Sequence, residues 1–281
     1  MVRTEFSIFA LNPDRSGVFH FHDSEWIGVG GPASQLFGGD WGLAATNPSS
    51  GDLFRYRNTP DQWAHIGGPG ASFAVTGESV YGLSTNPVGG GVFRYDGNDM
   101  SWTRIGGPAG QIYGGSWGLV ATNPSNGNLF RYLGTPDNWQ QIGGPGASFA
   151  VTRDSVYGLS TNPAGGGVFR YDGNDMSWTR IGGPAGQIYG GDWGLAATNP
   201  DTGELFGFQF ASPEDNPDIS PGVWIHLGGP GASFAVSSET IFGLSTNPVG
   251  GGVFRYDGDD TAWSRIGGPA DSIVAAFWVN V

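Results

Sequence analysis

The chain has 281 residues, including 52 Gly, 19 Pro, 11 Trp and 18 Phe. The aromatic content argues against a disordered chain, although Gly and Pro are abundant. The net charge of −13 argues against binding to nucleic-acid phosphates or to anionic membrane surfaces. The sequence contains no Cys, which excludes disulfides and thiolate metal sites.

A repeat organises the chain from Pro32 onward. The tripeptide Gly-Gly-Pro recurs with its proline at Pro32, Pro69, Pro108, Pro145, Pro184, Pro230 and Pro269. Successive spacings are 37, 39, 37, 39, 46 and 39 residues, so two unit types alternate. We call the units that begin at Pro32 and Pro69 types A and B. The single long spacing comes from an insertion in the third A unit, at residues 208–222.

Each unit contains four short runs of β-forming residues. In the unit that begins at Pro108, these runs are QIY, GLVAT, LFRYL and WQQI. Val, Ile and aromatic residues fill the runs, whereas Gly, Pro, Asn and Asp fill the gaps between them. Four strands in about 38 residues are typical of one blade of a β-propeller.

The two ends of the chain complete one more blade. Residues 269–281 are sufficient for one inner strand, and residues 1–31 match the last three strands of a unit. We therefore predict an all-β fold in which residues 1–281 form a single seven-bladed β-propeller domain of four-stranded antiparallel blades. One blade is split between residues 1–31 and 269–281, and closing the ring with both termini removes the free sheet edge.

The repeat favours binding over catalysis. The B units at residues 69–105 and 145–181 differ at three positions, so they predict equivalent surface sites. An enzyme needs one asymmetric constellation instead. P-loop, GxSxG and HExxH motifs are absent, and His20 and His22 form at most half of a metal site. We expect no enzymatic activity, no cofactor and no metal, although the DGND loops at residues 96–99 and 172–175 could be turns or calcium ligands.

Two sets of Trp recur at fixed positions. One Trp begins the fourth run of every unit, and we expect it to pack the outer strand against the next blade, with ligand contact as the alternative. The second set occurs only in A units and comprises Trp41, Trp117, Trp193 and Trp278. The first three follow Gly-Gly in a tight loop, where a large ring is either an exposed platform that stacks on a sugar or part of the core at the channel rim.

The Arg of the (L/V)-F-R-Y motif is the most informative polar position. It occurs as Arg55, Arg94, Arg131, Arg170 and Arg255, whereas His20 and Gly207 replace it in two blades. An Arg that faces another blade needs acceptors, because an unpaired buried charge is costly. These acceptors are either backbone carbonyls or a nearby Asp such as Asp96, or they are the hydroxyl groups of a ligand. Ligand binding by Arg predicts five sites per chain, and binding by the second Trp set predicts three or four.

The pattern W-x-x-I-G-G-P, followed by a Gly-rich turn, G-L-x-(S/T)-N-P and (V/L)-F-R-Y, resembles the tectonin and tachylectin type of β-propeller lectin. The resemblance covers nearly the whole chain, from Phe6 to Val279. It implies short blades, closure by the termini and equivalent sugar sites on or between blades. It also implies ligands such as N-acetylated hexosamines and other surface sugars.

These observations predict a multivalent carbohydrate-binding lectin for neutral or N-acetylated glycans. The candidate ligand-binding residues are the five Arg and the four Trp of the second set. The alternative is a scaffold for protein interactions, for which the acidic insertion Glu214–Asp218 is the candidate patch. A propeller hydrolase or lyase would need a carboxylate or His cluster in the central channel, and the repeat indicates none.

Localisation is indicated only by absent signals. The amino-terminal residues lack the basic region and long apolar run of a signal peptide, so we expect cytoplasmic synthesis, with later release to the outside as an option. The longest apolar run, Ile273–Val279, is too short to span a bilayer, which excludes membrane insertion by a helix. The sequence does not indicate the oligomeric state.

Overall fold

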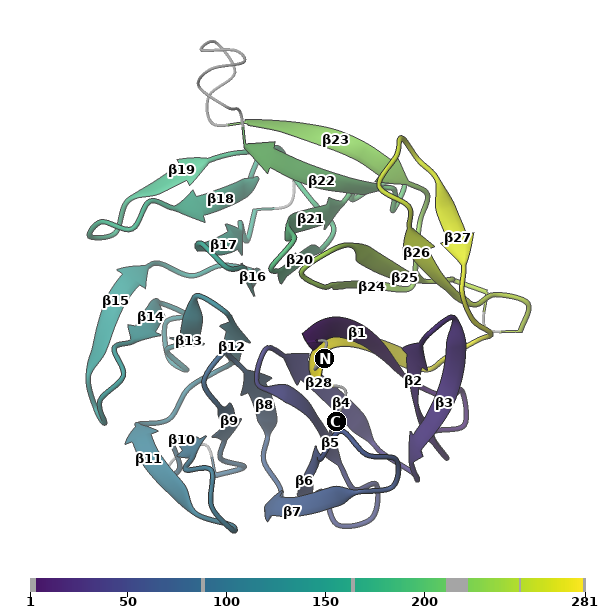
Figure 1. Cartoon of the computed structure of the whole chain (residues 1–281). Helices are drawn as coiled ribbons and strands as arrows, with labels where there is room; N and C mark the ends of the chain where they lie inside the picture. Colours follow the sequence, from purple (N-terminus) through teal and green to yellow (C-terminus); the bar gives the residue numbers. More distant parts are fainter. Residues whose placement is uncertain (1–3, 87–88, 163–164, 211–221, 248, 280–281) are drawn as a thin grey trace.

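The computed structural model describes residues 4–86, 89–162, 165–210, 222–247 and 249–279. These residues form 28 strands and no helix, so none of them belongs to a helix that could cross a membrane. The strands make seven sheets of four antiparallel strands, arranged in a ring (Figure 1). The predicted seven-bladed β-propeller is therefore confirmed.

Three complete blades come from A units. The first contains β4 (Gln35–Gly39), β5 (Gly42–Thr46), β6 (Leu53–Tyr56) and β7 (Trp63–Gly67). The second contains β12 (Ile112–Gly115), β13 (Gly118–Thr122), β14 (Leu129–Tyr132) and β15 (Trp139–Gly143). The third contains β20 (Ile188–Gly191), β21 (Gly194–Thr198), β22 (Leu205–Phe210) and β23 (Gly222–Gly228). We call these the A blades.

Three blades come from B units and alternate with the A blades. The first contains β8 (Ser72–Val75), β9 (Val80–Leu83), β10 (Val92–Tyr95) and β11 (Trp102–Gly106). The second contains β16 (Ser148–Val151), β17 (Val156–Leu159), β18 (Val168–Tyr171) and β19 (Trp178–Arg180). The third contains β24 (Ser233–Val236), β25 (Ile241–Leu244), β26 (Val253–Tyr256) and β27 (Trp263–Arg265). We call these the B blades.

The seventh blade is split between the two ends of the chain, as predicted. Its inner strand is β28 (Ser272–Val279), followed outward by β1 (Thr4–Leu11), β2 (Val18–His22) and β3 (Glu25–Gly30). The pairing of β28 with β1 extends from Ser272–Leu11 to Val279–Thr4. Strands β28 and β1 lie side by side in Figure 1, so strands from the two ends of the chain close the ring together.

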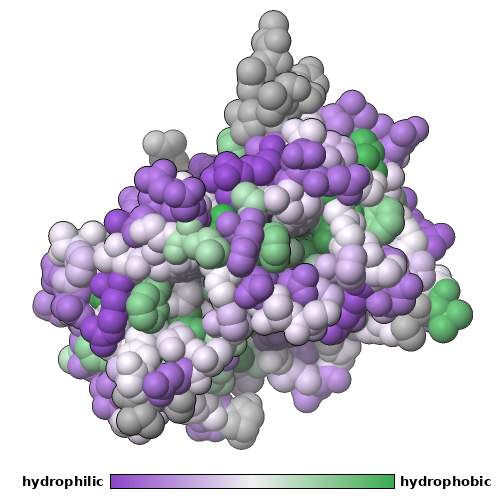
Figure 2. Space-filling view, turned by 90° about the horizontal axis from the view of Figure 1, so that it is seen from below, coloured by the Kyte–Doolittle hydropathy of each residue, from purple (hydrophilic) through white to green (hydrophobic). Residues whose placement is uncertain are grey.

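The hydrophobic core lies between the blades. The second strands of the B blades, such as β9, are buried at every position, because a neighbouring blade covers each face of the sheet. The seven apolar clusters among the described residues each join two adjacent blades; for example, Leu53 of the first A blade packs with Phe73 and Val80 of the next. Hydrophobic residues on the outer surface, by contrast, form small areas between hydrophilic ones (Figure 2). Each blade therefore depends on its neighbours for stability.

A Trp–Gly contact joins every pair of blades. The indole Nε1 of each outer Trp donates to a backbone carbonyl of the preceding blade at 2.6 to 2.8 Å, at Trp26, Trp63, Trp102, Trp139, Trp178, Trp224 and Trp263. A Cβ on the first Gly of the Gly-Gly-Pro motif opposite would lie 2.5 to 2.9 Å from that Nε1. The packing role predicted for this Trp is confirmed, but its partner is the preceding blade and not the next one. The Gly is required because the ring approaches the backbone so closely.

Candidate functional site

The candidate Arg and Trp residues form pairs in two A blades. The Arg55 guanidinium carbon lies 3.9 Å from the centroid of the Trp41 ring, and that of Arg131 lies 3.8 Å from Trp117. This is cation–π geometry, which places the positive charge over the electron-rich face of the indole. The ring of Trp41 also meets Tyr95 of the next blade edge-on, at 5.8 Å between centroids. The pair therefore lies in a blade interface, with one ring face covered by its own Arg.

In the blades of Trp193 and Trp278, Gly207 and His20 replace the Arg, and other groups fill the space that the Arg side chain would take. A Cβ at Gly207 would lie 2.8 Å from Cη2 of Trp193, so the missing side chain makes room for the ring. In the split blade, the buried His20 stacks on Phe9 at 4.4 Å and lies 4.9 Å from Trp278. Trp278 is 7% exposed, so the expectation of an exposed platform is wrong at this position.

The buried His20 is held in a neutral form. The Ser7 hydroxyl donates its proton to the Phe21 carbonyl at 2.8 Å, so His20 Nε2–H must be the donor to Ser7 Oγ. Burial, together with the smaller effect of the His22 charge, lowers the pKa of His20 to about 4. Because Nε2 carries a proton, this nitrogen is neither a base that could activate Ser7 nor a metal ligand.

The Arg residues of the B blades have varied surroundings. Arg94 is paired in register with Tyr81 on the adjacent strand. Arg170 lies 5.0 Å from the Phe210 ring, and its buried Nε has no hydrogen-bond partner within the described part of the chain. Arg255 lies 3.9 Å from the Asp257 carboxylate, which follows the expectation of an Asp acceptor. Ligand binding by the five Arg residues stays a prediction.

On the opposite side of the same strands lie small cavities between blades. Four equivalent ones, with volumes of about 160 to 190 Å³, occur in the three A blades and in the second B blade. Each is lined by the Gly-Pro of the Gly-Gly-Pro motif, by the Phe of the third strand and by the outer Trp. The Phe and Trp pairs are Phe54 with Trp63, Phe130 with Trp139, Phe169 with Trp178 and Phe206 with Trp224. We call these cavities the inter-blade pockets.

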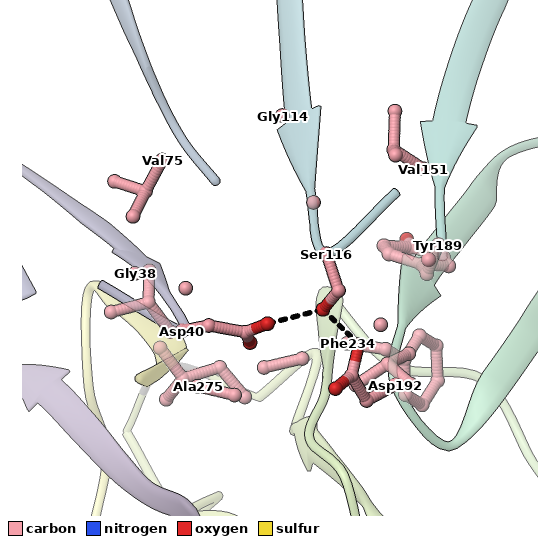
Figure 3. A pocket seen from close by; sticks show the side chains of 18 residues that line it. Gly38, Asp40, Val75, Gly114, Ser116, Val151, Tyr189, Asp192, Phe234 and Ala275 are labelled. Carbon is pink, nitrogen blue, oxygen red and sulfur yellow. Dashed lines mark hydrogen bonds between the residues drawn. The ribbon is translucent and has the colours of Figure 1, made fainter. Parts of the chain in front are cut away.

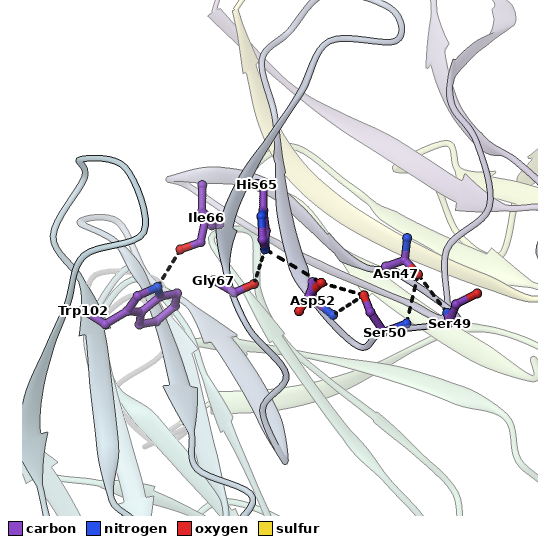
Figure 4. A network of polar contacts seen from close by, with 8 residues as sticks. All are labelled: Asn47, Ser49, Ser50, Asp52, His65, Ile66, Gly67 and Trp102. Atoms are coloured by element: carbon purple, nitrogen blue, oxygen red, sulfur yellow. Dashed lines mark hydrogen bonds and ion pairs between the residues drawn. The ribbon is translucent and has the colours of Figure 1, made fainter.

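An Asn amide supplies a polar group in the A-blade pockets. Asn47 lines the first of them, and its Oδ1 accepts hydrogen bonds from the backbone of Ser49 at 2.8 Å and Ser50 at 3.1 Å (Figure 4). Asn123 and Asn199 make the same turn in the other two A blades. Since the turn uses the carbonyl oxygen, Nδ2 is the donor that the Asn presents.

The rim of two A-blade pockets carries a His and an acid. The His65 ring stacks on Phe54 at 4.9 Å, and its Nε2 lies 3.1 Å from the Gly67 carbonyl and 3.9 Å from the Asp52 carboxylate (Figure 4). His226 and Glu204 are arranged in the same way in the third A blade. The rims of these pockets therefore combine a His with a carboxylate.

The B-blade pocket has a more aromatic wall. Phe149 lies across two glycines, because a Cβ at Gly146 or Gly158 would approach its ring to 2.7 or 3.1 Å. Phe149, Phe169 and Trp178 all line this pocket, with Ser160 where the A blades have Asn. The same Gly–Phe contact, 2.7 Å from a Cβ, occurs at Gly70 with Phe73 and at Gly231 with Phe234. The other two B blades therefore share this wall.

Sequence reasoning did not identify the inter-blade pockets. Their walls come from the most regular parts of the unit, namely Gly-Gly-Pro, the Asn before proline and the Phe of F-R-Y, which had been assigned to turns and strand packing. The signal that could have found them is that the Phe, the outer Trp and the Gly-Pro recur together in every complete unit.

The central channel contains a polar cluster that the sequence did not predict. A cavity of about 220 Å³ is lined by the inner strands, and at its edge Ser116 Oγ lies within hydrogen-bond distance of the Asp40 and Asp192 carboxylates (Figure 3). Arg153 Nη2 donates to Asp192 at 3.1 Å. The expectation that the channel holds no carboxylate cluster is therefore wrong. The ring brings together turns that are each 76 residues apart in the sequence.

The two carboxyl groups of the channel cluster have different surroundings. Burial raises the pKa of Asp40, and although a hydrogen bond from Ser116 opposes this shift, the charge of Asp192 adds to it. The Asp192 side chain, 7% exposed, has Arg153 as its ion-pair partner. In the part of the chain that the structure describes, no group of three or more His, Cys, Asp or Glu residues is placed to hold a metal ion.

The DGND loops are tight turns in the structure. Gly97 and Asp99 have positive φ angles of 89° and 45°, and the Asp96 N–H donates to the Ser101 carbonyl at 3.0 Å. Gly173 and Asp175 repeat this geometry. The turn interpretation thus accounts for these residues. The acidic patch proposed at Glu214–Asp218 lies outside the described residues.

Comparisons with known proteins identify the fold only. No protein-family model and no curated protein matches the chain. Among solved structures, the chain is similar to a Mycobacterium tuberculosis puromycin-hydrolyzing peptidase (TM-score 0.60, 13% identity, covering 96% of this chain and 54% of that one). It is also similar to TolB from Acinetobacter baumannii (TM-score 0.55, 14% identity, covering 96% of this chain and 66% of TolB). A third similar structure is the ectodomain of the Physcomitrella patens receptor kinase CR4 (TM-score 0.53, 13% identity, covering 90% of this chain and 75% of that one).

These matches limit what similarity can say about function. The chain spans about half of the peptidase and about two thirds of TolB. None of the three is named as a lectin, and their identities are too low to show more than a shared β-propeller. Only the geometry and chemistry of the site therefore bear on function.

Proposed function

We propose that this chain is a multivalent carbohydrate-binding propeller without enzymatic activity. The observation that carries the proposal is the set of equivalent inter-blade pockets, each with two aromatic rings facing a small cavity. An aromatic face packs well against the apolar C–H face of a sugar ring. The cavities are smaller than a drug-sized site, which suits a single sugar residue.

Polar groups at the pockets give the proposed ligand its orientation. The Asn amide in each A-blade pocket offers a hydrogen-bond donor to a hydroxyl or acetamido oxygen. The carboxylates of Asp52 and Glu204 at two rims disfavour anions there. These features support neutral or N-acetylated sugars as ligands of the A blades.

The repeated arrangement of the pockets supports avidity. Several weak sites on one rigid ring bind a glycan-rich surface more tightly than any single site does, without new contacts. Failure to bind any glycan on an array, together with failure to agglutinate cells, would contradict the proposal.

A pair of neighbouring residues tests where the sugar binds. Phe130 lines a pocket, whereas Arg131 faces the opposite side of the strand over Trp117. With the best methyl glycoside from an array, calorimetry of Phe130→Leu should give one binding site fewer per chain. Arg131→Gln should leave the number unchanged. The reverse result would move the site to the predicted Arg and Trp residues.

A further inference from the structure

The A and B blades differ in charge at one equivalent position beside the pockets. The residue two positions after the outer Trp is His65, Gln141 or His226 in the A blades and Arg104, Arg180 or Arg265 in the B blades. This position follows the outer Trp by two residues, so both side chains lie on the same face of the strand. A change from His or Gln to Arg therefore alters the rim of the second B-blade pocket, and the other two B blades carry the same Arg.

Register places each of these Arg residues directly beside a pocket wall. Arg180 is paired with Phe169, which lines the second B-blade pocket, and the same pairing joins Arg104 to Phe93 and Arg265 to Phe254. In the A blades the equivalent His65 stacks on the wall residue Phe54. The guanidinium group thus takes the place of the imidazole ring at the pocket rim.

The local loop fixes the Arg without using all of its donors. Arg180 Nη2 donates to the Gly166 carbonyl at 2.9 Å, and Arg265 Nη2 donates to Gly251 at the same distance. Each bond uses one of the five N–H donors of a guanidinium group. Arg104 is 49% exposed, and its contact with Asp137 is a surface ion pair at 3.8 Å, which is weak. The charges are therefore positioned and still open to an anion.

The opposite charge marks two of the three A-blade rims. Asp52 and Glu204 lie 3.9 Å from the His at the equivalent position, whereas the B blades have a glycine-rich loop there. An anionic ligand is repelled by these carboxylates and attracted by the B-blade Arg. The guanidinium fork also matches the two oxygens of a carboxylate or the oxygens of a sulfate.

We propose that the B-blade pockets bind sugar residues that carry one anionic substituent, whereas the A-blade pockets bind neutral sugars. The inference rests on the proposed function, since it assigns ligand classes to the same pockets. The sugar ring packs against the aromatic wall formed by Phe149, Phe169 and Trp178, and its carboxylate or sulfate pairs with Arg180. The alternation of unit types along the sequence thereby becomes an alternation of two specificities around the ring.

Matched sugars that differ only in charge test this inference. The probes are methyl β-glucuronide with methyl β-glucoside, and the corresponding galacto and manno pairs. In at least one pair the uronide should bind about tenfold more tightly than its neutral parent, at three sites per chain, and the preference should fall as salt is added.

A triple variant identifies the residues responsible. Arg104→Gln, Arg180→Gln and Arg265→Gln together should abolish the uronide preference and preserve binding of the neutral sugar. Gln already occupies this position at Gln141, so the strand accepts it. The control removes three positive charges elsewhere, at Arg15, Arg57 and Arg153, and should retain the preference. Thermal unfolding of both triple variants checks that they are folded. A triple Lys variant should keep part of the uronide preference, because it keeps the positive charge.

The outcomes separate the two proposals. If neutral sugars bind and no uronide binds more tightly than its parent, the inference on charge is wrong and the proposed function stands. The inference also fails if the triple Gln variant keeps the full preference. If no member of any pair binds, this inference fails, and the glycan array then decides the proposed function.

Discussion

Phe130 and Arg131 are adjacent in one strand and face two different surfaces between blades. Phe130 lines a cavity, and Arg131 covers the Trp117 ring at 3.8 Å. Alternation along the strand thus separates a site that is open to ligand from a cation–π pair within a blade interface. At the scale of single residues, the aromatic and not the charged residue of the F-R-Y motif faces the proposed sugar site.

The buried His20 predicts loss of stability in acid. The pKa of His20 in the folded protein is about 4, below its usual value of 6.5, because burial disfavours the charged ring. Between pH 6.5 and pH 4 the unfolded chain therefore takes up a proton that the folded chain does not. The free energy of unfolding should fall by about 2 to 3 kcal/mol over this range. Urea unfolding at pH 7 and pH 4.5 should show a smaller loss for His20→Gln, and equal losses in both proteins would contradict the assignment.

Two adjacent glycines form a matched test of the Trp–Gly contact. A Cβ at Gly143 would lie 2.9 Å from the Trp178 Nε1, whereas a Cβ at Gly144 would meet nothing within 4 Å. Gly143→Ala should lower the free energy of unfolding by about 1 to 3 kcal/mol, because the indole must move away from its carbonyl partner. Gly144→Ala should change it by less than about 0.5 kcal/mol. Equal effects in chemical denaturation would show that the ring does not depend on this contact.

At the scale of the blade, the turn between the first two strands has two forms. A-blade turns place Asp40, Ser116 and Asp192 together at the channel, and one B-blade turn adds Arg153 where its near-copy has Gly77. The repeat is therefore broken where the inner turns meet. The three A-blade pockets farther out keep the same lining.

The channel cluster predicts a stabilising substitution. Burial and the charge of Asp192 raise the pKa of Asp40, so the folded state disfavours the ionised form. The stability contributed by the protonated group is present at low pH and is lost as the pH rises through its folded pKa. Asp40→Asn removes the charge and should raise the melting temperature at pH 7, with the gain disappearing near pH 3. Asp192→Asn serves as the contrast, because it breaks the ion pair with Arg153. A lower melting temperature for Asp40→Asn at pH 7 would contradict this account.

The sequence predicted the blades better than the sites. Strand content, blade number and the split blade follow from periodic turn residues and from β-forming runs, which are local features. The pockets and the channel cluster depend on which turns meet across the ring, and Asp40 meets Ser116 from 76 residues away. For the Trp set that includes Trp278, the sequence left open an exposed platform or a place in the core. The Trp278 ring is buried beside His20, because the two ends of the chain share one blade. Spacing alone carries no information on such contacts.

At the scale of the whole molecule, the ring is closed by a hairpin-like pairing of the two ends. Thr4 is paired with Val279, so the ends of the described chain lie next to each other. Other blades join the same two strands by a short turn, as at Asp40 and Trp41. The split blade therefore differs from the others in its connection and not in its architecture.

Circular permutation tests this equivalence. Joining the two ends by a short Gly-rich turn and opening the chain at Gly97, in the exposed loop between β10 and β11, should give a folded protein, because new termini in an exposed loop are tolerated. The permutant should unfold cooperatively and bind the same number of sugars as the parent chain. Failure to fold would show that the split blade has a role beyond closing the ring.

The number of sugars bound per chain tests the central claim most directly. Native mass spectrometry with the best methyl glycoside, checked by calorimetry, counts occupied sites without assuming where they lie. The equivalent inter-blade pockets predict at least three occupied sites per chain, since the cavities of the three A blades have the same lining. A saturating value of one site, or no binding at all, would contradict a multivalent ring.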